Sequence, residues 1–133
     1  MVEMAVVLPI FFMVVLGIVE FGRAMMVGQL ATNAAREGAR LAILDGSTNT
    51  EVEDSIKDFL QTTVGVAPGD VTVDITVVAA PGNENDAGNE VGSAHPKDLC
   101  KVKVEIPFDK VNFIPGSYPG GKKLVGHSAM RHE

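Results

Sequence analysis

The chain has 133 residues, a formal net charge of −6 and a hydrophobic fraction of 46%. This length allows one domain with one modest core. The acidic balance argues against a nucleic-acid partner, because phosphate binding needs a basic face. The single cysteine excludes an internal disulfide framework and a zinc site built from several cysteines.

The apolar residues are concentrated near the N-terminus, where residues 4–19 include no charged side chain. As a helix this run spans about 24 Å, slightly less than a hydrocarbon core of about 30 Å, and the stem of Arg23 extends it. A basic segment before the run and a small-residue cleavage site after it are both missing, so the layout differs from that of a removable signal peptide. We therefore predict an anchor that is kept in the mature protein.

Pro9 lies inside this apolar run. Proline cannot donate a backbone hydrogen bond, and its ring crowds the preceding turn, so we predict that the helix is kinked or unwound between Ala5 and Pro9 in the assembled state. Such a bend would also let the first residues turn toward a neighbouring chain. A plain transmembrane anchor that tolerates the proline is the alternative.

The helical pattern continues to about residue 44, since residues 24–44 are rich in good helix formers and the turn-forming cluster 45–49 follows. Small residues form one stripe along this part at steps of three and four: Ala24, Gly28, Ala31, Ala35, Gly38 and Ala42. The stripe has two alternative uses, which are close approach of another helix and packing under the protein's own sheet. Gly17 weakens the helix within the apolar run, so we predict that it too has a packing role.

The remainder of the chain predicts a small α+β domain. Apolar residues at steps of three and four predict a short amphipathic helix over residues 51–64, starting after Thr50 and ending at Gly65. Alternating polar and apolar residues predict strands over 71–79 and 99–106, and less clearly over 122–130.

We expect these strands to form a three-stranded antiparallel sheet whose apolar face packs on the long helix. The polar segment 81–96 between the first two strands is expected to be an exposed loop. The predicted fold is thus a long N-terminal α-helix with a small domain of one short helix and one sheet. We divide the chain into a hydrophobic assembly helix, residues 1–45, and a globular domain, residues 46–133.

The sequence predicts no catalytic, cofactor-binding or metal site, so we expect no cofactor and no enzymatic activity. His95, His127 and His132 lack metal-ligand spacing and are expected to be solvated or without a functional role. Cys100 shares the apolar phase of its strand, which favours a buried thiol over a nucleophile. The oxygen-rich residues of the 83–90 loop break the EF-hand order, so a hydrated loop is favoured over a calcium site.

Glu3 is a carboxylate at the head of an apolar helix, and two roles are open for it. It can stay at the membrane interface. In a helical polymer it could instead face the N-terminal ammonium of another subunit, where the pair would fix the axial register.

Three stretches carry a family resemblance: Val2–Pro9, Leu16–Ala24 and Thr32–Arg40. Together they resemble the signature of the TadE-like pilins, and Gly126–Glu133 resembles the closing strand of that family. The resemblance implies a type IV pilin-like fold of the tight-adherence (Tad) class, cut by a prepilin peptidase just before the apolar helix. Glu3 matches the family's glutamate near the mature N-terminus, although type IV pilins place it fifth and this chain places it third.

The resemblance implies a structural pilin subunit that polymerises through its N-terminal helix into an extracellular Tad pilus for adhesion. A membrane-resident minor pseudopilin, assembly factor or tip adhesin is the alternative, because the main pilins of this system are much shorter and lack a globular domain. The implied partners are further copies of the chain, the Tad assembly machinery, the prepilin peptidase and, before assembly, the inner membrane. The predicted assembly residues are Glu3, Pro9, Gly17 and the small-residue stripe.

Overall fold

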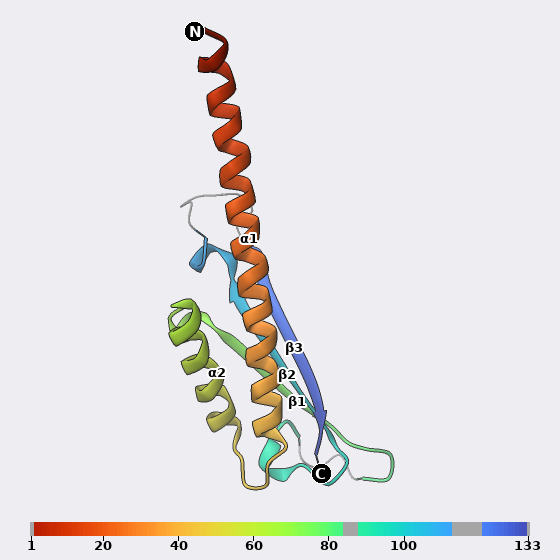
Figure 1. Ribbon diagram of the computed structural model, residues 1–133. Helices are drawn as coiled ribbons and strands as arrows, with labels where there is room; N and C mark the ends of the chain where they lie inside the picture. Colours follow the sequence, from red (N-terminus) through yellow and green to blue (C-terminus); the bar gives the residue numbers. More distant parts are fainter. Residues whose placement is uncertain (1, 84–87, 113–120, 133) are drawn as a thin grey trace.

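The computed structural model describes residues 2–83, 88–112 and 121–132, and it confirms the predicted α+β class (Figure 1). A long helix is followed by a shorter helix and three strands, with short 3₁₀ turns between them. The elements are α1 (Val2–Ala42), α2 (Asn49–Val64), η1 (Pro68–Asp70), β1 (Thr72–Val78), η2 (Val91–Ser93), β2 (Leu99–Pro107), η3 (Phe108–Lys110) and β3 (Lys123–Arg131).

The three strands form one antiparallel sheet in the order β1-β2-β3. Across the sheet, Ile75 lies opposite Val102, and Val102 lies opposite Ser128. Because side chains alternate between the two faces of a strand, the buried valines of β2 share one face and its lysines share the other. The sheet therefore has an apolar inner face and a polar outer face, as the alternation predicts.

The core lies between the inner face of the sheet and the two helices. The second half of α1 crosses this face against β2 and β3, and α2 lies beside it (Figure 1). The buried apolar residues of α1 are Val27, Ala31, Ala34, Ala35, Ala39 and Ala42, and they join those of α2 and the sheet in one cluster. We call this unit the head: residues 27–42 of α1 together with α2, the sheet and their connections. Its core spans the sequence division predicted at residue 45.

The ends of α2 are fixed by local hydrogen bonds. The Thr48 hydroxyl accepts from the Glu51 backbone N–H, while the Glu51 carboxylate accepts from the Thr48 N–H, which makes a capping box. The helix start predicted at Thr50 is therefore wrong by two residues. The predicted stop at Gly65 is confirmed, because its φ of 81° is left-handed and its N–H donates to the Gln61 and Leu60 carbonyls.

The subunit itself shows no unwinding between Ala5 and Pro9, because α1 is a continuous helix from Val2 to Ala42. Proline at position 9 removes only its own hydrogen bond to the Ala5 carbonyl. The residues on both sides keep their helical conformation, so one missing bond does not interrupt the helix.

The loop between β1 and β2 is tied to the head by a buried carboxylate. Oδ1 of Asp98 accepts from the Ala80 N–H at 2.9 Å and from the Asn83 amide at 2.7 Å, and Oδ2 accepts from the His95 N–H at 2.9 Å. The Asp98 carbonyl accepts from the His132 N–H at 2.7 Å. These bonds join both ends of the loop to the end of β3. The loop predicted to be simply exposed is therefore anchored at Asp98.

Acid is expected to weaken the head through two carboxyl groups. Hydrogen bonds from Ala80 and Asn83 lower the pKa of Asp98, and Lys103 and Lys123 lower the pKa of Glu105 from 4.5 to about 2. A carboxyl with a lower pKa in the folded state stabilises the fold above its unfolded pKa, and this contribution is lost as the pH falls through the folded value. The free energy of unfolding should therefore fall as the pH drops from about 4.5 to 2.

Chemical denaturation of the full chain in detergent micelles, repeated over this pH range, measures the effect. In the Asp98→Asn and Glu105→Gln variants the free energy of unfolding should fall less steeply with decreasing pH than in the wild type. Asp54→Asn, at an exposed position of α2, should show the same fall as the wild type. A flat profile for the wild type would contradict the assignment.

Candidate assembly surface

Residues 2–19 of α1, the exposed segment, project beyond the head (Figure 1). Their large apolar side chains are between 36% and 79% exposed, and they surround the helix on all sides: Val2, Met4, Val6, Val7, Leu8, Ile10, Phe11, Phe12, Met13, Val14, Val15, Leu16, Ile18 and Val19. Within the described chain, α1 is the one helix long and apolar enough to cross a membrane, and the apolar window is uncovered. An apolar surface of this size requires lipid or other protein around it.

Glu3 and Pro9 both lie on the exposed segment. Glu3 is in the first turn of α1, where a carboxylate interacts favourably with the positive end of the helix dipole. Gly17 is on the same segment, and a side chain added there would meet no atom within 4 Å. These three residues are accessible to a neighbouring chain.

The small-residue stripe is divided between two environments. Ala31, Ala35, Gly38 and Ala42 are buried in the head, so the structure shows packing under the protein's own sheet for these four. A neighbouring subunit cannot reach them in this fold, and we assign them to the core of the subunit. Their small side chains let the strands approach the helix axis closely.

Ala24 and Gly28, the other two residues of the stripe, are only partly buried. They line an apolar groove of about 410 Å³ between α1 and β3, together with Phe21, Met25, Gln29, Thr32, Leu124 and Val125. The groove begins at the end of the head that faces the exposed segment. The accessible assembly candidates are therefore Glu3, Pro9, Gly17, Ala24 and Gly28.

Alanine substitutions at Gly28 and Gly38 should have different effects on stability. A Cβ at Gly28 meets no atom within 4 Å, so Gly28→Ala is expected to stabilise the protein by about 0.5–1 kcal/mol through helix propensity. A Cβ at Gly38 would lie 2.4 Å from Ile56 Cδ1. Since Ile56 must shift, Gly38→Ala should leave the stability of the protein unchanged or lower it. Denaturant midpoints of the full chain in micelles compare the two, and equal gains would contradict the burial of Gly38.

Arg23 connects α1 to the head just after the exposed segment. Nε of Arg23 donates to the carbonyl of Val111, which follows η3. Glu20 is only 8% exposed. This contact of Arg23 with the head was not predicted from the sequence. The sequence did contain a signal for such a contact, because Glu20 and Arg23 are opposite charges three residues apart directly after the apolar run.

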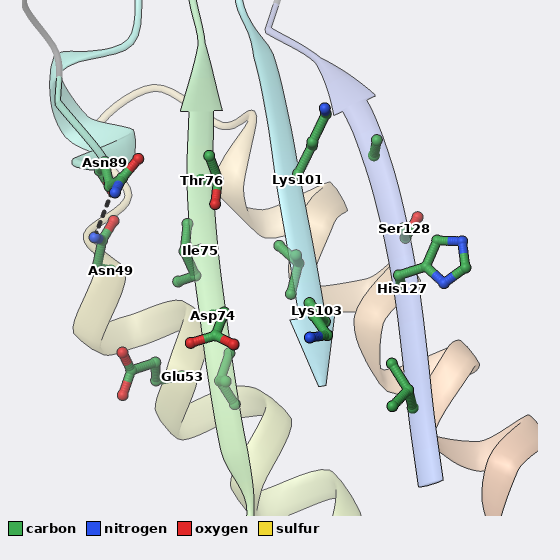
Figure 2. Close-up of a pocket in the computed structure, with 14 residues that line it drawn as sticks. Asn49, Glu53, Asp74, Ile75, Thr76, Asn89, Lys101, Lys103, His127 and Ser128 are labelled. Carbon is green, nitrogen blue, oxygen red and sulfur yellow. Dashed lines mark hydrogen bonds between the residues drawn. The ribbon is translucent and has the colours of Figure 1, made fainter. Parts of the chain in front are cut away.

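A shallow hollow of about 860 Å³ includes side chains of all three strands together with Asn49, Glu53 and Asn89 (Figure 2). It contains a serine, a histidine and an aspartate, but His127 and Ser128 are neighbours on β3 and point to opposite faces. They therefore cannot form a nucleophile and base pair. Among the described residues, no cluster of three or more His, Cys, Asp or Glu side chains could hold a metal ion. Part of the candidate calcium loop, residues 84–87, lies outside the described residues.

The cysteine and one histidine are buried. Cys100 is fully buried, as predicted, and its thiol lies 3.9 Å from the Ala42 carbonyl. Burial raises the pKa of this thiol, and the Asp98 charge raises it further, which disfavours the reactive thiolate. Of the three histidines, His132 is not solvated, because it is 7% exposed and lies 3.7 Å from an Asp45 carboxylate oxygen.

Comparison with known proteins is consistent with this geometry. The family model described as TadE-like protein matches residues 1–40. No curated protein and no solved structure matches the chain. The matched residues contain the exposed segment and most of the small-residue stripe, while the sheet lies outside the match. The resemblance stated from the sequence is therefore confirmed over the N-terminal helix, which is similar to that of TadE-like proteins.

Proposed function

We propose that the protein is a structural pilin subunit that polymerises through α1 into an extracellular Tad pilus for adhesion. The observation that carries the proposal is the exposed segment, which is apolar on all sides and joined to the head by an uninterrupted helix. The inner membrane would cover this segment before assembly. The same segments of neighbouring subunits would cover it in the filament core, with the heads outside.

The accessible residues support specific roles in such a core. Gly17 lets another backbone approach closely, as small residues do between membrane helices. Glu3 offers a carboxylate to the N-terminal ammonium that a prepilin peptidase would create on the next subunit. A pair of this kind is stable among apolar helices only when both charges are present, so it would select one axial position.

Electron microscopy of material sheared from cells, combined with mass spectrometry of the subunit, tests the proposal. We expect filaments in which this chain is the main component, and the spectrum will also give the mature N-terminus. A chain that is found only in the membrane fraction, with filaments unaffected by its deletion, would overturn the proposal.

A second candidate function is that of a minor pseudopilin, assembly factor or tip adhesin that remains in the membrane or at one end of the pilus. The head favours this candidate, because the main pilins that the resemblance implies lack a globular domain. Subunit stoichiometry separates the two functions. A structural subunit should account for most of the filament mass, whereas an assembly factor should be nearly absent from filaments that nonetheless require it.

A further inference from the structure

The outer face of the sheet is an uncovered and mainly basic surface. Both helices lie behind the sheet when it is viewed from this face (Figure 2). Its charged side chains come from alternate positions of the strands: Asp74, Lys101, Lys103, Glu105, Lys123 and Arg131. Glu105 is already paired with Lys103 at 2.6 Å and Lys123 at 2.8 Å. Lys101 and Arg131 are exposed without an ion pair among the described residues.

The outward side of α2 is an acidic ridge, defined by Glu51, Asp54 and Asp58. At 100° per residue these three lie on the side opposite the buried Val52, Ile56 and Leu60. All three are exposed. Lys57, the basic residue of this helix, is paired with Glu53 at 3.2 Å. The ridge therefore presents uncompensated negative charge.

The two surfaces differ in charge because the sequence itself is divided. Residues 46–98 include ten acidic and two basic side chains, whereas residues 99–133 include three acidic and six basic ones. Like surfaces of two heads would repel each other, and unlike surfaces would attract. The hollow of about 860 Å³ on this side of the sheet is lined by Lys101 and Lys103, and also by Asp74 and by Glu53 of α2.

We propose that the outer sheet face of one head docks on the acidic ridge of α2 in a second copy of this chain. The two surfaces are different patches on different sides of the head, so the contact is heterologous. A heterologous contact that does not close on itself leaves one surface free at each end and propagates as an open helical array. The inference rests on the proposed filament and adds a contact between heads to the contact between helices.

Charge reversal on each surface tests the docking. Lys101→Glu removes a cation from the sheet face, and the pair Asp54→Lys and Asp58→Lys reverses the ridge. We expect each to lower the filament mass per cell about fivefold, since an exposed pair made repulsive changes an affinity by roughly this factor. Their combination should recover at least half of the loss. The matched controls Arg40→Glu and Glu90→Lys, at exposed positions on neither surface, should assemble as the wild type does.

A cross-link measures the contact directly. The full chain carrying Asp58→Cys and Lys101→Cys, treated in membranes and in sheared material with a short bis-maleimide, should give a ladder of dimers and larger species. The control chain carrying Arg40→Cys and Asp58→Cys should give no ladder. Cys100 is buried and present in both chains, so it cannot account for a difference between them. Circular dichroism of each variant in micelles checks that the head is folded.

The outcomes separate the two proposals. If the wild type makes filaments, the head contact is overturned when the Asp58→Cys and Lys101→Cys chain gives no ladder, or when the reversal variants assemble like the controls. Either result would leave the pilin function standing. A wild type that makes no filaments would overturn the pilin function. In that case the membrane sample alone decides the head contact, which a ladder there would support and its absence would overturn.

Discussion

Replacing Gly126 with valine is expected to unfold the head. Gly126 lies opposite Val104 in the sheet and faces α1. A Cβ at this position would lie 2.3 Å from the Ala31 carbonyl carbon and 2.4 Å from the Thr32 nitrogen. These are backbone atoms of a packed helix, so they cannot move aside as the tip of a side chain can. We expect a loss of about 3 kcal/mol or more, at or beyond the upper end for an overpacked core.

Denaturant unfolding of the full chain in micelles, together with protease resistance of the head, measures the loss. Ala129→Val is the matched control, because it introduces the same valine side chain on the exposed outer face of β3. It should change the free energy of unfolding by less than about 0.5 kcal/mol. A Gly126→Val protein with the wild-type midpoint would show that β3 and α1 do not approach this closely.

The secondary structure was largely predictable because it depends on how apolar residues repeat along a short stretch of chain. Alternation over two residues locates β2 to within one residue at its C-terminal end, and β1 and β3 to within one residue at each end. The spacing of three and four residues similarly predicts α1 and α2, with an error of about two residues at the end of α1 and of two residues at the start of α2. The error at α2 arose because Thr50 and Thr48 are both acceptable caps by residue type. Only the position of the Glu51 carboxylate selects Thr48.

The partners of the functional residues were less predictable, because they depend on contacts distant in sequence. The spacing of the small-residue stripe shows that something approaches α1 closely, but not what. The structure shows that β3 approaches at Ala31 and Ile56 of α2 approaches at Gly38. The role of Asp98 likewise depends on Ala80 and Asn83, which only the folded loop brings to it. The apolar run needed no such contact, so the sequence alone identified the exposed segment that we propose for assembly.

Glu3→Ala is expected to abolish most filament formation while leaving the subunit stable in the membrane. Glu3 lies at the far end of the exposed segment, away from the head, so its loss should not alter the free energy of unfolding. In the proposed filament core the substitution would leave the ammonium of the next subunit buried and unpaired. Removing one partner of a buried pair costs about 3–5 kcal/mol, which corresponds to a fall of roughly a hundredfold or more in subunit affinity.

The measurement is the mass of sheared filaments relative to the subunit in the membrane fraction, determined for each variant by quantitative immunoblotting. Glu37→Ala is the matched control, since Glu37 is an exposed glutamate on the same helix within the head. It should assemble normally. Glu3→Asp keeps the charge on a shorter side chain and should form part of the wild-type filament mass. Normal filament mass from Glu3→Ala at a normal membrane level would place Glu3 at the membrane interface instead, because an unpaired ammonium in an apolar core could not be tolerated at every subunit.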